Sequence, residues 1–86
     1  MNDLKTFFEI YGSVYTILYD KYMYKTTARE IFNIPDNENP LNAGDEWIIT
    51  HQEEVEKLIE YRQDYFTSDR EIIALYITLR ITKDIR

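Results

Sequence analysis

The clearest periodic pattern in the chain is that of residues 3–22, DLKTFFEIYGSVYTILYDKY. At about 100° per residue, its apolar side chains fall on one face of a helix and its polar side chains on the opposite face. The apolar face consists of Leu4, Phe7, Phe8, Tyr11, Val14, Tyr15, Leu18 and Tyr22, with Ile10, Ile17 and Tyr19 at its margins. The pattern predicts a long first helix.

The apolar arc of this helix is wider than one core requires. It spans roughly 200°, against the ~100° of a stripe that faces a single core. We therefore expect part of the arc to pack against a second copy of the chain. Tyrosine suits such a half-buried place because its ring packs while its hydroxyl stays hydrated. The residues assigned to this homodimer interface are Tyr11, Tyr15, Leu18, Tyr19 and Tyr22.

Three capping boxes, in which a Ser or Thr is followed three residues later by a Glu, mark the starts of further helices. They are Thr27 with Glu30, Thr50 with Glu53, and Ser68 with Glu71. The first predicts a short helix over 28–33, and the second predicts a helix over 51–66. The apolar face of the 51–66 helix is made by Val55, Leu58, Ile59, Tyr65 and Phe66.

The third box precedes residues 72–83, where the pattern fits two structures. Apolar residues alternate strictly with others at positions 73–82, as they do in a half-buried strand. The capping box and the basic last turn favour a helix. We therefore expect a single all-α domain over residues 1–86, with three long helices and one short one. The alternative is an α+β fold in which residues 72–82 form a strand.

Residues 35–45, PDNENPLNAGD, have the composition of a loop. They hold both prolines, three of the five asparagines and one of the two glycines of the chain. We expect an extended connection here, after which Trp47, Ile48 and Ile49 return the chain to the core. A loop of about eleven residues is near the upper end for an unstructured connection, and such loops are functional or mobile.

Composition narrows the classes of function. Sixteen acidic residues against ten basic ones give a formal charge of -6 and a pI near 4.6, which argues against direct binding to nucleic acid or to an anionic membrane. The chain has no cysteine and one histidine, His51, so neither a thiolate site nor a histidine-based metal site can be assembled. No phosphate-binding glycine motif or nucleophile elbow occurs. We expect no enzyme activity, no catalytic residues, no metal and no cofactor.

The residue usage also suggests a source and a compartment. Twelve Ile and eight Tyr against three Ala are typical of AT-rich codons, which points to a low-G+C bacterium or one of its phages. No apolar stretch is long enough to span a membrane, and an acid at position 3 does not fit a secretory signal. The expected location is the cytoplasm of a bacterium or of a phage-infected bacterium.

The negative charge is concentrated in the middle of the chain. Residues 36–64 carry nine acids against Lys57 and Arg62, and the flanking segments are nearly neutral. Within the predicted 51–66 helix, four of these acids lie in a sector of about 80°, away from the apolar face. They are Glu53, Glu56, Glu60 and Asp64, and only the spacing of Glu53 and Lys57 offers an offsetting ion pair.

Two interpretations of this acidic region remain open. In the first, it serves only solubility, in a structural or adaptor protein that forms homo-oligomers through the first helix. Alternatively, the chain is a binding inhibitor that mimics nucleic acid and occupies a basic groove of a nucleic-acid-acting protein, as phage-encoded host inhibitors, anti-CRISPR proteins and bacteriocin immunity proteins do. We favour the inhibitor. Its partner-binding residues would be Glu53, Glu56, Glu60, Asp64, Asp45 and Glu46, with Trp47 and Tyr61 as apolar anchors.

Overall fold

The computed structural model of the chain describes residues 4–21, 31–63 and 65–84. Within these ranges the fold is all-α, with four helices and no strand. The helices are α1 (Leu4–Lys21), α3 (Pro40–Thr50), α4 (Gln52–Arg62) and α5 (Asp69–Asp84). The all-α prediction is confirmed. The alternative strand over 72–82 is wrong, because these residues belong to α5.

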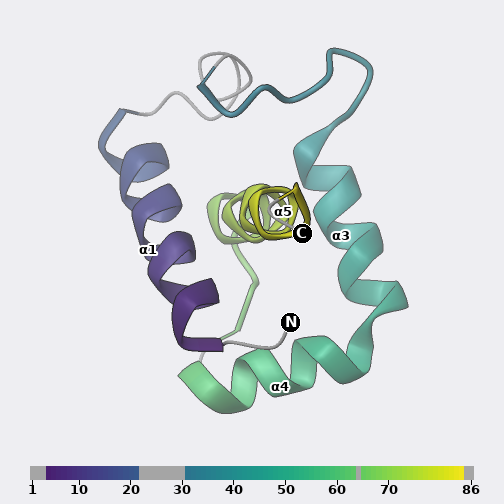
Figure 1. Cartoon of the computed structure of the whole chain (residues 1–86). Helices are drawn as coiled ribbons and strands as arrows, with labels where there is room; N and C mark the ends of the chain where they lie inside the picture. The colour runs from purple at the N-terminus through teal and green to yellow at the C-terminus, as the bar shows by residue number, and fades with distance from the viewer. Residues whose placement is uncertain (1–3, 22–30, 64, 85–86) are drawn as a thin grey trace.

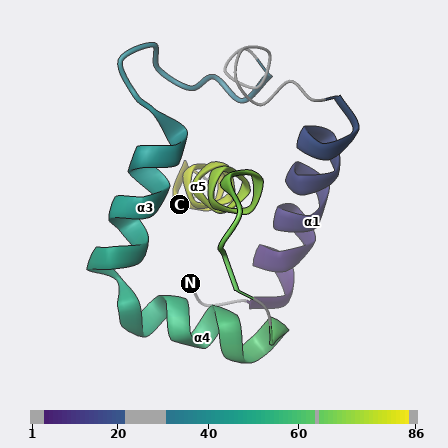
Figure 2. The same ribbon diagram turned by 180° about the vertical axis from the view of Figure 1, so that it is seen from behind.

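Helix α5 occupies the centre of the fold. Figure 1 looks nearly along its axis, with α1 on one side of it, α3 on the other, and α4 across the end where α1 begins and α3 finishes. The view from behind in Figure 2 shows the same arrangement. Both α1 and α3 contact α5, and α3 contacts α4 at the corner where the two helices join. Three helices therefore enclose a fourth.

The central position of α5 explains why its sequence pattern fitted two structures. Every residue from Ile72 to Leu79 is buried, so this stretch has no polar face to reveal a helical period. Thr78 is the one polar residue among them, and its hydroxyl donates a hydrogen bond to the Ala74 carbonyl at 2.7 Å. That bond satisfies the hydroxyl where water does not reach it.

The core is built around α5 from the helices that surround it. α1 contributes Phe7, Val14 and Leu18, and α4 contributes Leu58, which is fully buried. Ile34, in the segment that precedes α3, also belongs to this cluster. The apolar face predicted for the first helix is therefore the face that packs on the core.

Helix α3 lies where a loop was predicted, so the extended connection over 35–45 is wrong from residue 40 onward. The side chain of Asn39 accepts hydrogen bonds from the backbone amides of Leu41 and Asn42, at 3.0 and 3.2 Å, and so caps the helix. Pro40 follows at the first helical position, where the missing amide costs nothing. Asparagine and proline thus start a helix here instead of forming a turn.

The second and third capping boxes behave differently. Ser68 and Glu71 form the predicted box: the Glu71 amide donates to the Ser68 hydroxyl oxygen at 3.3 Å, and the Glu71 carboxylate accepts from the Ser68 amide at 3.1 Å. Thr50 does not cap the next helix, because it is the last residue of α3 and its hydroxyl donates back to the Glu46 carbonyl at 2.9 Å. α4 begins at Gln52 without a side-chain cap.

The predicted helix over 51–66 is too long. α4 ends at Arg62, because Gln63 adopts a left-handed backbone with φ of 57° and its amide bonds to the Ile59 carbonyl. Tyr65 therefore lies beyond the helix and is exposed, whereas Phe66 still packs against the core. The short helix predicted over 28–33 and its Thr27–Glu30 box lie largely outside the described residues.

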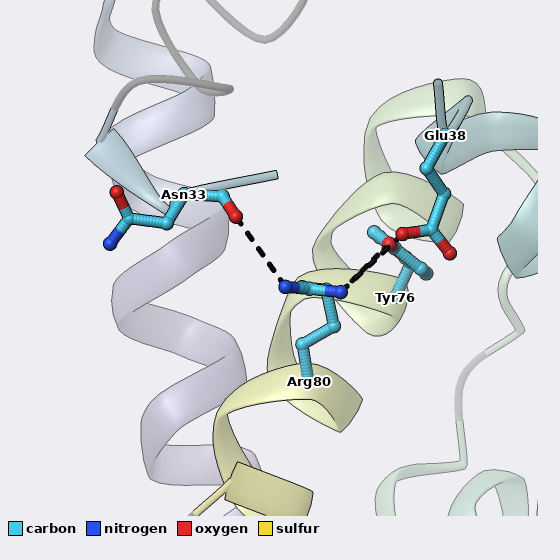
Figure 3. A network of polar contacts seen from close by, with 4 residues as sticks. All are labelled: Asn33, Glu38, Tyr76 and Arg80. Atoms are coloured by element: carbon cyan, nitrogen blue, oxygen red, sulfur yellow. Dashed lines mark hydrogen bonds and ion pairs between the residues drawn. The ribbon is translucent and has the colours of Figure 1, made fainter. Parts of the chain in front are cut away.

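Arg80 of α5 ties the segment that precedes α3 to the centre of the fold (Figure 3). Its guanidinium donates to the Glu38 carboxylate at 3.4 Å, to the Asn33 carbonyl at 3.4 Å and to the Tyr76 hydroxyl at 3.5 Å. The Arg80–Glu38 ion pair is about one-third exposed on each side. It joins two residues that are far apart in the chain.

Candidate protein-binding surface

The acidic surface comprises five exposed carboxylates on two consecutive helices. Asp45 and Glu46 lie on α3, and Glu53, Glu56 and Glu60 lie on α4. Figure 1 shows these two helices on two adjacent sides of the fold, meeting at a corner. In the part of the chain that the structure describes, none of the five forms an ion pair. Their charge is therefore left to solvent or to a partner.

On α4 the acidic residues lie opposite the face that packs. Val55 and Leu58 are buried, whereas Glu53, Glu56 and Glu60 are exposed. Helix geometry separates the three carboxylates by about 4.5 and about 6 Å along the axis. The offsetting pair expected between Glu53 and Lys57 is not formed within the described structure. Asp64, the fourth acid of the predicted line, lies outside the described residues.

His51 fixes the corner between α3 and α4. Its ring stacks on the Trp47 ring with centroids 4.6 Å apart and planes 8° apart. Its Nδ1 atom lies 3.0 Å from the Trp47 carbonyl oxygen and 2.8 Å from the Thr50 hydroxyl oxygen. Trp47 is half-buried and packs on the core. Trp47 therefore serves the corner and the core, and offers a partner less surface than an exposed anchor would.

The corner also holds a shallow depression of about 440 Å³, lined by residues 49–54. Ile49 stands at its edge and is 68% exposed, although the sequence pattern placed it in the core. The signal that could have revealed this exposure is its spacing. Ile49 lies three and four residues after Glu46 and Asp45, and therefore on the same side of α3 as these exposed acids.

Two tyrosines add exposed aromatic surface near the end of α4. Tyr61 is 50% exposed, and its ring stacks on the buried Phe8 ring of α1 with centroids 5.5 Å apart and planes 5° apart. Tyr65 is 65% exposed and was missed as a surface residue because the sequence pattern extended the helix past it. Tyr61 is thus both exposed and fixed from behind, as a binding anchor should be.

Two of the five residues expected to form a homodimer interface are used within the chain. Tyr11 and Leu18 are buried in the core, so in this fold they are core residues and offer no surface to a second chain. Tyr15 is half-buried, with its ring centroid 6.2 Å from that of Tyr11. The Tyr19 side chain and Tyr22 lie outside the described part. Tyr11 and Leu18 are used within the chain because α1 packs against α4 and the segment after α4 as well as against α5.

Contacts on two sides account for the wide apolar arc of α1. Phe8 meets Tyr61 of α4, and Tyr11 meets the ring of Phe66, edge to face, with centroids 5.6 Å apart. The arc therefore faces α5, α4 and the segment after α4 at once. Ile17, 37% exposed, is the large apolar side chain that the described part of α1 leaves at the surface.

The described residues contain no group of three or more side chains of the kinds that hold a metal ion. Among them there is also no helix with the length and hydropathy needed to cross a membrane. No family model matches the sequence, and the searches of curated proteins and of solved structures found no significant match. The surface described above is therefore the basis for a functional proposal.

Proposed function

We propose that this chain is a non-enzymatic binding protein whose acidic surface occupies a basic groove of a nucleic-acid-acting protein. The observation that carries the proposal is that Asp45, Glu46, Glu53, Glu56 and Glu60 are all exposed and form no ion pair within the described structure. Exposed charge of one sign gives a partner of the opposite sign both an orientation and a faster association.

The arrangement is unfavourable for the isolated helix, which supports a role in binding. Glu56 and Glu60 are four residues apart on α4, and like charges at that spacing destabilise a helix by a few tenths of a kcal/mol. Lys57 is exposed on the same helix and does not pair with Glu53 to offset the repulsion. Charges that the fold does not use are available to a partner.

The spacing of the carboxylates supports a groove that normally holds nucleic acid. One strand of a duplex carries a charge about every 3.4 Å along its axis. The carboxylates of α4 follow one another at about 4.5 to 6 Å, which is of the same order. A groove lined by lysine and arginine to hold phosphates would therefore meet negative charge at a similar density on α4.

The test uses the full chain, immobilised and exposed to a bacterial lysate at low salt. Proteins that an excess of duplex DNA elutes are the expected partners, because DNA should compete for the same groove. The variant Glu56→Gln/Glu60→Gln should capture much less of them. A matched control, Glu9→Gln/Asp69→Asn, removes two exposed acids outside the acidic surface and should capture as much as the unmodified chain.

Two results would contradict the proposal. Capture that DNA does not compete, or that survives both the double substitution and high salt, would exclude an acidic surface in a basic groove. A chain that captures nothing and instead forms a salt-insensitive dimer would favour the structural alternative. Tyr11 and Leu18 of α1 are buried in the core of the protein, which weighs against the structural alternative.

A further inference from the structure

We infer that the outer face of Tyr61 is the anchor of this surface and that it receives an arginine side chain of the basic partner. The inference rests on the proposed function and adds to it the residue of the partner that is recognised. It depends on three observations: the support behind the Tyr61 ring, the exposure of that ring, and a guanidinium already placed on the same aromatic cluster.

The Tyr61 ring is held in place by the core of the protein. It lies parallel to Phe8, whose side chain is buried, and Phe8 is itself in edge-to-face contact with Phe7 and Tyr11. These contacts bring together residues of α1 and α4. A ring supported in this way loses little conformational freedom when a partner binds, so less of the binding energy is spent on ordering it.

The Tyr61 side chain is nevertheless 50% exposed, which leaves it open to a partner. Partial exposure beside a well-packed aromatic cluster is the usual setting of a binding hot spot, where tyrosine is enriched. In the sequence it directly follows Glu60, one of the exposed acids of α4. A group that binds on Tyr61 therefore meets an aromatic ring on a segment, residues 40–63, whose net charge is negative.

The negative charge of residues 40–63 favours a cation as the ligand, and the aromatic ring of Tyr61 favours arginine over lysine. Residues 40–63 carry six acids against Lys57 and Arg62, so the occupant is expected to be positive. The planar guanidinium of arginine stacks on aromatic rings, whereas the lysine ammonium is more strongly hydrated. The protein uses the same contact internally, since the Arg62 guanidinium lies 5.2 Å from the centre of the Phe8 ring.

The experiment measures the binding of fluorescein-labelled deca-arginine and deca-lysine, which carry equal charge, to the full chain at low salt. We expect deca-arginine to bind more tightly. Guanidinium groups also pair well with carboxylates, so the decisive quantity is the change caused by Tyr61→Leu. This substitution should weaken deca-arginine binding roughly two- to five-fold, the effect of one cation–π contact at an exposed site. Its effect on deca-lysine should be smaller.

Two variants serve as controls. Tyr61→Phe keeps the ring and should keep the preference for arginine. Tyr65→Leu removes a more exposed tyrosine that lies beyond α4 and stacks on no ring in the described structure, and should leave both affinities unchanged. An equal affinity of the unmodified chain for the two peptides, or a preference that survives Tyr61→Leu, would overturn the inference while leaving the proposed function intact.

A failure of the proposed function is detected separately, because the lysate experiment would then yield no protein that duplex DNA elutes. Thermal unfolding of Tyr61→Leu checks that the variant is folded. If it is not, the ring-proton shifts of Tyr61 in the unmodified chain decide the question. Shifts induced by deca-arginine and not by deca-lysine support the inference, and the absence of such a difference overturns it.

Discussion

Gly44 of α3 touches Ile72 of α5 so closely that no side chain fits between them. A Cβ atom at position 44 would lie 2.6 Å from Cγ2 of Ile72 and 2.9 Å from its carbonyl oxygen. The side chain of Ile72 could rotate, but its carbonyl belongs to the buried central helix. Glycine is therefore required at position 44 for close packing of two helices.

We predict that Gly44→Ala destabilises the fold. Alanine gains about 1 kcal/mol over glycine from helix propensity, but forcing a methyl group into packed backbone costs typically ~1–3 kcal/mol and more where backbone must move. The steric cost should exceed the propensity gain, with a net loss of up to about 2 kcal/mol in the free energy of unfolding. Urea denaturation followed by circular dichroism measures this loss.

Gly12→Ala is the matched control, because it makes the same change in another helix. A Cβ atom at position 12 would meet nothing within 4 Å. The substitution should therefore gain about 0.5–1 kcal/mol of stability from helix propensity alone. If the two variants changed stability by the same amount and in the same direction, the close approach of α3 and α5 would be refuted.

The Ser68 box, which forms, and the predicted Thr50 box, which does not, provide a second matched pair. Ser68→Ala should lower the free energy of unfolding by about 1 kcal/mol, because it removes the hydroxyl that accepts from the Glu71 amide at the start of α5. Thr50→Ala should cost only a few tenths, since the Thr50 hydroxyl bonds to carbonyls within its own helix. Chemical denaturation compares the free energies of unfolding of the two variants. An equal loss for both would contradict the finding that Ser68 caps a helix and Thr50 does not.

Stability at high pH should depend on Tyr76. Burial, and then the hydrogen bond with the Glu38 carboxylate, raise the pKa of Tyr76 from 10 to about 12, while Arg80 acts in the opposite direction. Between pH 10 and pH 12 the unfolded chain releases this proton and the native chain retains it. Rising pH therefore favours unfolding across this range. The contribution of Tyr76 to stability is complete below pH 10 and is lost as pH rises through 12.

Tyr76→Phe isolates this contribution from the other seven tyrosines, which both proteins share. The unmodified chain should lose stability more steeply than Tyr76→Phe above pH 10, because only the unmodified chain carries the shifted group. The measurement is the free energy of unfolding of both proteins as a function of pH. Parallel curves across this range would show that the Tyr76 pKa is not raised.

The fold was predictable from sequence wherever a helix keeps a polar face. α1 has such a face, and its apolar residues were placed correctly on the core. α5 does not, because residues 72–79 are buried on all sides, and the Ser68–Glu71 box and the basic last turn had to decide between a helix and a strand. Periodicity carries no information where a helix is enclosed by others.

α3 was missed for a different reason. Asparagine and proline are typical of loops, yet Asn39 followed by Pro40 also has the order of an N-cap and a first helical residue. The same residue types serve both structures, and the tertiary contact of Gly44 with Ile72 shows which one this chain adopts. Glu53, Glu56 and Glu60 are exposed, as the sequence pattern predicted. Ile49 was misplaced because its spacing from the exposed acids of α3 has meaning only once residues 40–50 are known to form a helix.

Glu60→Gln distinguishes a charge that serves the fold from a charge that serves binding. Glu60 is exposed, forms no ion pair in the described structure and lies four residues after Glu56. Glu60→Gln should therefore relieve repulsion and raise the free energy of unfolding by about 0.2–0.5 kcal/mol at low salt. High salt should remove the gain, because it screens exposed charges. The same variant should capture less of the DNA-eluted partner. If the Glu60 carboxylate stabilised the fold, Glu60→Gln would instead be less stable than the unmodified chain. That outcome would contradict the assignment of Glu60 to a binding surface.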